Sequence, residues 1–220
     1  MATSQQVQEF RRNNTALVAL AENDLADFWS ALRLDGDPVL VRNAMLDFYP
    51  ELVTAYGDAA ALLAADFYDA TRNVPPSAAR FTAVLSQPVV TDQSQAAARW
   101  GVGPLFQSAP LPADAFSRLS GALQRLVLQP GRSTQIDSAL RDPQRMGFAR
   151  VPVGATCPFC TMLASRGFVY ANERAAGESN KWHNRCDCVI VSGRSLSDLP
   201  DDYDVDEYLR RYQASEGIPA

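Results

Sequence analysis

Histidine and lysine are nearly absent from this chain of 220 residues: His183 is its one histidine and Lys181 its one lysine, beside nineteen arginines. With a single histidine that is itself a plausible metal ligand, no second one remains for a Ser-His or Cys-His relay, and the HExxH pattern is missing. These absences argue against the common hydrolase mechanisms. We therefore expect a protein that is not an enzyme and has no small-molecule substrate.

Long apolar runs are missing as well. No stretch approaches the ~18 apolar residues of a membrane span, and the beginning, MATSQQVQEFRRNN, lacks the apolar centre of a signal peptide. We expect a protein of the cytosol without membrane contact, where cysteines more often bind metal or catalyse reactions than form structural disulfides. Because 47% of the residues are hydrophobic and 20% are charged, the chain can bury a real core.

Acidic charge is concentrated in residues 196–220, which hold seven acidic residues and two arginines and account for the whole formal charge of −5. A neutral body with an acidic tail is a poor electrostatic partner for nucleic acid. Region 113–151 is a local exception with six arginines and three aspartates, which we interpret as a solvated helical face. The six are Arg118, Arg125, Arg132, Arg141, Arg145 and Arg150.

Two long helices are predicted in residues 1–74. Apolar residues recur at helical spacing from Val7 to Leu32 and from Val41 to Phe67, which indicates an antiparallel helical hairpin. Pro50 should kink the second helix or begin a new one. Both apolar stripes are longer than one hairpin needs, so we predict that they dock on partner proteins; the alternative is that they pack into the chain's own core.

Residues 75–145 predict a further, shorter helical segment. Pro130-Gly131 should close its main helix, and Ser133 or Thr134 should cap a new one, with Asp137 placed three residues after Thr134 as in a capping box. The first ~145 residues are thus expected to be nearly all α.

The sequence pattern changes from helical to β-like after residue 145. The runs FARVPV, GFVY and CDCVIVSG are short and β-like, which predicts a small mixed α/β domain at residues 146–197. Residues 198–220 predict an acidic terminal helix with an apolar stripe from Val205 to Tyr212, capped by Asp201 or Asp202. We predict that this helix also docks on partner proteins; the alternative is that its stripe packs into the chain's own core. The fold class expected for the whole chain is α+β, mainly α-helical at the N-terminal side.

All soft metal ligands of the chain lie between residues 157 and 188. Cys157 and Cys160 have the two-residue gap that lets both sulfurs point at one ion, His183 and Cys186 repeat it, and Cys188 follows two residues on. Structural zinc needs four tetrahedral N or S donors. We predict a structural zinc ion that cross-links residues 146–197. Of the five candidate donors, Cys188 is the one we expect not to bind the ion directly or to bind it only as an alternate ligand.

Two alternatives to structural zinc stay open. The cysteines could be reduced and partly buried, or form disulfides such as Cys157–Cys160 or a bridge between the two segments. A metallo-hydrolase would need an open metal position with a carboxylate beside it, such as Asp187 or Glu178. The order of the motif does not fit cytidine-type zinc deaminases, in which a His-x-Glu precedes the cysteine pair.

The segment TCPFCTMLASRGFVY followed by KWHNRCDCVIV resembles the C-terminal signature of the phage head morphogenesis family, the Mu F-like minor head proteins, in the versions of actinobacterial phages. The match covers about forty residues, including the two-cysteine turn, Gly167 with its aromatic run, and His183 followed by Cys186 and Cys188.

The resemblance implies a minor structural protein of the capsid. Such a protein would lie at the portal vertex and the inside of the head in the virion, after assembly in the host cytoplasm. Its partners would be portal and major capsid proteins, with packaged DNA as a further candidate. The main alternative function is a zinc-knuckle module that binds nucleic acid through the arginines of region 113–151 and Trp182; a metallo-hydrolase ranks behind it.

Overall fold

The computed structural model describes residues 2–152, 157–168, 182–186 and 188–215. Glu178, Asp187 and the second half of the GFVY run, residues 169–170, lie outside these described residues. Within them, no helix combines the length and the apolar character that crossing a membrane requires.

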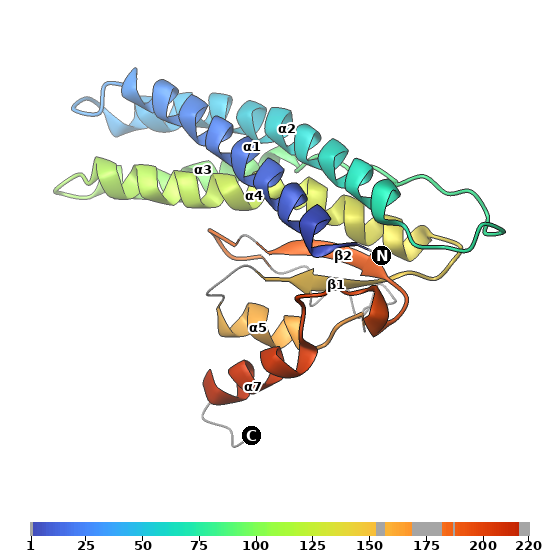
Figure 1. The fold of residues 1–220 in the computed structure, drawn as a ribbon. Coiled ribbons are helices and arrows are strands. Elements are labelled where there is room, and N and C mark those ends of the chain that lie inside the picture. Colours follow the sequence, from blue (N-terminus) through green and yellow to red (C-terminus); the bar gives the residue numbers. More distant parts are fainter. Residues whose placement is uncertain (1, 153–156, 169–181, 187, 216–220) are drawn as a thin grey trace.

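The fold is α+β, with three layers in the view of Figure 1. The helical layer contains α1 (Ser4–Ser30), α2 (Pro38–Thr71), α3 (Thr91–Gly101) and α4 (Pro112–Arg141), with a short 3-10 helix at Gly103–Phe106. Beneath it lies a sheet of β1 (Gly147–Val151) and β2 (Val189–Gly193), followed by a 3-10 turn at Leu196–Asp198. On the far side of the sheet lie α5 (Pro158–Ala164) and α7 (Val205–Ser215).

The predicted hairpin of long helices is present, and both helices have clear N-terminal caps. Thr3 and Gln6 form a capping box on α1, and Asp37 accepts a hydrogen bond from the N–H of Val39 at the start of α2. α2 runs through Pro50, so the alternative that this proline begins a new helix is wrong. Burial of the same helix face on both sides of it, at Met45 and Val53, offsets the lost backbone hydrogen bond.

α4 is one helix of 30 residues, so the predicted end at Pro130-Gly131 and the restart at Ser133 or Thr134 are also wrong. The hydroxyl of Thr134 accepts a hydrogen bond from the N–H of Ser86 (3.0 Å) instead of capping a helix. Gly131 serves contact between helices: a Cβ atom there would lie 2.8 Å from the carbonyl oxygen of Ala60 in α2. The glycine therefore marks the close crossing of α2 and α4.

The apolar stripes of the two N-terminal helices pack into the chain's own core, which contradicts the prediction that they dock on partners. One cluster joins α1, α2, α3 and α4 around Leu25, Met45 and Leu123, all 0% exposed. The reason is α4, whose central turns supply the buried surface that the hairpin alone lacks.

The sheet is antiparallel, with Gly147 opposite Gly193 and Val151 opposite Val189, and every residue of both strands is buried. A second apolar cluster packs the start of α1 and the end of α2 against the sheet. Its members include Val7, Phe10, Ala64, Phe67, Ala149, Val151, Val189 and Val191. This cluster joins residues on both sides of residue 146. The domain boundary at that residue stays a prediction.

The acidic terminal helix α7 has no buried residue in its described length. Its cap is Asp204 and not Asp201 or Asp202 as predicted, because Oδ1 of Asp204 accepts the N–H groups of Asp206 (2.9 Å) and Glu207 (3.0 Å). The ring of Tyr208 lies 5.1 Å from that of Tyr203, which ties the helix to the body of the protein.

Candidate metal centre

The five predicted donors come together at one end of the sheet. Cys157 is the N-cap of α5 and Cys160 lies in its first turn, while His183, Cys186 and Cys188 lie in the segment before β2. They form two overlapping groups, Cys157–Cys160–His183 and Cys160–Cys186–Cys188, and the donor atoms of each group all lie within 4.8 Å of one another. Cys160 belongs to both groups.

The donor distances fit the edges of a metal-centred tetrahedron. With bonds of about 2.3 Å to sulfur and about 2.0–2.1 Å to nitrogen, the edges would be about 3.8 Å for two sulfurs and about 3.5 Å for sulfur and nitrogen. Nε2 of His183 lies 3.2 Å from Sγ of Cys157 and 3.6 Å from Sγ of Cys160. Sγ of Cys160 lies 3.8 Å from Sγ of Cys186. These Cys/His groups are therefore positioned to hold a metal ion.

Local backbone geometry produces this arrangement. Sγ of Cys157 accepts the backbone N–H of Cys160 (3.4 Å), and Pro158 occupies the first helical position of α5, where no N–H is needed. On the other segment, Nδ1 of His183 lies 2.8 Å from the carbonyl oxygen of Asn184. An N–H on Nδ1 leaves the lone pair of Nε2 facing the two sulfurs, the orientation that metal-binding histidines show.

The three inner thiols, Cys160, Cys186 and Cys188, are buried and interact with one another. Hydrogen bonds from Cys160 and Cys188, helped by the charge of Arg132, hold the pKa of Cys186 far below its usual range. Hydrogen bonding with Cys186 and burial raise the pKa of Cys160 to about 11, and contacts with Cys160 and Cys186 raise that of Cys188. The ionisation of one inner thiol therefore opposes the ionisation of its neighbours.

Two buried arginines border the inner thiols, a feature that the sequence analysis missed. Nη2 of Arg132 donates to the carbonyl oxygens of Cys186 (2.5 Å) and Cys188 (3.3 Å), and Nη1 of Arg150 lies 3.6 Å from Sγ of Cys160. Both guanidinium groups also lie on the ring of Trp182, 3.9 Å and 3.6 Å from its centroid. Burial lowers the pKa of Arg132 to about 10, which still leaves it charged at neutral pH.

These two residues correct the interpretation of region 113–151 as a solvated face. Arg118, Arg141 and Arg145 are exposed, but Arg132 and Arg150 are only 5% and 2% exposed. A buried cation is costly without compensating negative charge. Negative charge on the cysteine sulfurs next to them would supply that compensation, so the two arginines fit a cluster of thiolates.

Comparison with known proteins places the chain among phage proteins. It is 29% identical to the Gene 15 protein of Mycobacterium phage L5 over 196 residues, an alignment that covers 69% of this chain and 65% of the relative, just under two thirds of its length. No solved structure shows a significant match. The family model described as VG15 protein matches residues 1–215. With nearly its whole length matched, the chain belongs to the VG15 protein family.

Proposed function

We propose that this chain is a non-enzymatic structural protein of a phage virion, whose C-terminal part is held together by a structural zinc ion. The observation that carries the zinc proposal is the pair of Cys/His groups that share Cys160, with donor distances of 3.2–3.8 Å.

The donor set favours zinc in a structural role. Sulfur and imidazole donors in a tetrahedral arrangement are typical of zinc, and a structural site uses four of them with no open position. The two groups contain no carboxylate among the described residues. When bound, zinc would cross-link α5 to the segment before β2. We propose Cys157, Cys160, His183 and Cys186 as its ligands, with Cys188 as the fifth donor outside this set.

The small sheet explains why a cross-link is useful here. A two-stranded antiparallel pair is marginal by itself in water. The donors lie on α5, which follows β1 by a short connection, and on the segment that leads into β2. An ion held by both would therefore keep the two strands in register, and its binding energy would add to folding stability.

The virion role is supported by the phage relative and by the cysteine-histidine motif, which resembles Mu F-like minor head proteins. We place the protein at the portal vertex or the interior of the capsid, with portal and major capsid proteins as partners. A nucleic-acid-binding role is less favoured, because Arg132 and Arg150 are buried and Trp182 is occupied by their guanidinium groups.

Two measurements test the proposal. Metal analysis of the full chain, purified without chelator, should give one zinc per chain, and X-ray absorption should give a shell of sulfur and nitrogen. A chain without metal, or a shell rich in oxygen, would refute the structural zinc. Immunoblotting of purified phage particles should detect the protein at a few copies per particle; its absence from particles would refute the virion role. Strong low-salt retention on DNA would support the alternative.

A further inference from the structure

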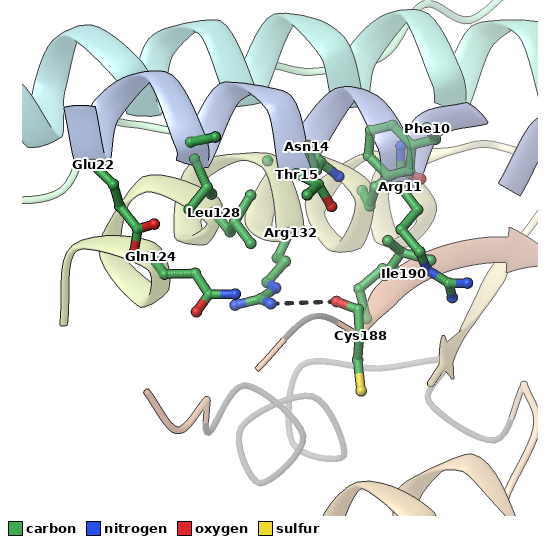
Figure 2. A pocket seen from close by; sticks show the side chains of 15 residues that line it. Phe10, Arg11, Asn14, Thr15, Glu22, Gln124, Leu128, Arg132, Cys188 and Ile190 are labelled. Atoms are coloured by element: carbon green, nitrogen blue, oxygen red, sulfur yellow. Dashed lines mark hydrogen bonds between the residues drawn. The ribbon is translucent and has the colours of Figure 1, made fainter. Parts of the chain in front are cut away.

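A cavity of about 220 Å³ lies where α1 and α4 pass over β2 (Figure 2). Its walls are largely apolar, with Phe10 and Val18 from α1, Leu128 from α4, and Ile190 from β2. Figure 2 shows Arg132 extending from α4 across this cavity toward the backbone of Cys188, with Gln124 beside it. Neither the metal centre nor the proposed virion role accounts for this space.

Two buried polar atoms from residues that line the cavity have no hydrogen-bond partner. Nη2 of Arg132 is used by the carbonyl oxygens of Cys186 and Cys188, but Nη1 is unsatisfied. Nε2 of Gln135 donates to the carbonyl oxygen of Ala64, which fixes the amide orientation and leaves Oε1 unsatisfied. Arg132 is 5% exposed and Gln135 1%. A buried donor or acceptor without a partner loses its hydrogen bond to water and gains none in return, so native proteins normally supply a partner.

The chemistry of the missing partner follows from these two atoms and the walls. Nη1 of Arg132 needs an acceptor and Oε1 of Gln135 needs a donor, a combination that an amide group offers and a carboxylate does not. A water molecule also offers both, and polar side chains such as Asn14 and Gln124 line part of the cavity, so a cavity filled with water is the outcome that the test has to exclude. An apolar body carrying one amide group would match the apolar part of the walls and offer a partner to each of the two atoms.

We propose that this cavity is a peptide-binding site that takes one branched aliphatic side chain together with its adjacent peptide group from a partner protein. The apolar walls receive the side chain, and Arg132 and Gln135 bind the C=O and N–H of the peptide group. Glu22 also lines the cavity, and its carboxylate accepts the hydroxyl of Ser120 (2.5 Å). Two arginines, Arg11 and Arg132, and this one glutamate line the cavity, so a test of the amide ligand has to include an anion of the same shape.

The test uses the full zinc-bound chain and N-acetyl-leucinamide as the probe, followed by the backbone amide signals of Val189 and Ile190 in NMR titrations. We expect saturable shifts at both residues. 4-Methylpentanol keeps the aliphatic body but replaces the two amide atoms with a single hydroxyl oxygen. It should bind about 2–10-fold more weakly, because one of the two hydrogen bonds is lost. Tighter binding of 4-methylpentanoate than of the amide would overturn the peptide assignment and indicate an anion site.

Two matched variants on α1 decide whether binding occurs in the cavity. Ala19 lines it and is exposed, so Ala19→Trp should plug it without disturbing the core and abolish the saturable shifts. Ala16 is exposed on the same helix but does not line the cavity, and Ala16→Trp should bind as the unmodified chain does. Equal binding by both variants, or no saturable shift with any probe, would refute the proposal and leave a cavity filled with water.

Discussion

The close crossing of α2 and α4 at Gly131 makes a quantitative prediction about Gly131→Ala. An added Cβ atom would lie 2.8 Å from the carbonyl oxygen of Ala60 and 3.2 Å from its carbonyl carbon. Both atoms belong to the backbone of another helix, so no side chain can rotate away to make room. The two helices would have to separate where they pack most closely.

The expected magnitude combines two opposing effects. Alanine in a helix interior is favoured over glycine by about 1 kcal/mol. Overpacking a well-packed core costs about 1–3 kcal/mol, and a contact with rigid backbone belongs at the upper end. Gly131→Ala should therefore lower the free energy of unfolding by about 1–2 kcal/mol.

Gly121→Ala in the same helix is the matched control. Its added Cβ atom would lie 3.5 Å from Cβ of Asn184, an ordinary contact, so only the helix propensity should act and stability should rise by about 0.5–1 kcal/mol. Thermal and urea unfolding measure both variants, with about 2–4 °C of Tm for each kcal/mol in a domain of this size. If Gly131→Ala is as stable as Gly121→Ala, the helices do not cross at this distance.

Three further predictions concern the metal centre, the buried ion pair and the terminal helix. Cys160→Ser should weaken zinc binding more than any other single substitution, because both donor groups contain Cys160; equal zinc loss from Cys188→Ser and Cys157→Ser would contradict the proposed ligand order. Although burial alone would raise the pKa of Asp142, hydrogen bonds from Arg72 (2.5 and 3.0 Å), the Gln144 N–H (2.8 Å) and Tyr68 (3.0 Å) hold it below its usual value. This carboxylate thus stabilises the fold above the unfolded-state pKa of about 3.9, and the contribution disappears as pH falls through the lower folded-state pKa. Asp142→Asn should cost about 3–5 kcal/mol at pH 7 and flatten the acid limb of a stability–pH curve, whereas exposed Asp58→Asn should do neither; an unchanged acid limb in Asp142→Asn would contradict this. Leu209→Ser on α7 should change stability by less than about 0.5 kcal/mol, since Leu209 is 41% exposed, yet reduce incorporation into phage particles, with exposed Leu20→Ser as the control; normal incorporation would reject α7 as a docking helix.

The donors of the candidate site were predictable from the sequence because their geometry is local. A two-residue gap between Cys157 and Cys160, or between His183 and Cys186, places two donors on one side of a turn wherever that turn lies. Arg132 and Arg150 were not predictable in the same way. They come from α4 and β1, more than 30 residues from Trp182, and charge patterning alone assigns an arginine to the surface. The weak signal was Arg150, which interrupts the apolar run GFARVPV, whereas Arg132 stands among polar and small residues and gave no such signal.

The helix end predicted at Pro130-Gly131 was wrong, because a local sequence signal does not include contacts between distant residues. Pro130-Gly131 is a strong local signal for a helix end, because proline lacks an N–H and glycine is flexible. Here the pair is retained for contact: Pro130 lies against Gly57, Gly131 against Ala60, and the carbonyl of Pro130 accepts the hydroxyl of Ser86 (2.8 Å). Proline and glycine occur both at helix crossings and at helix ends, so the sequence pattern is the same in the two cases. Only the partner helix distinguishes them, and α2 precedes this pair by some 70 residues.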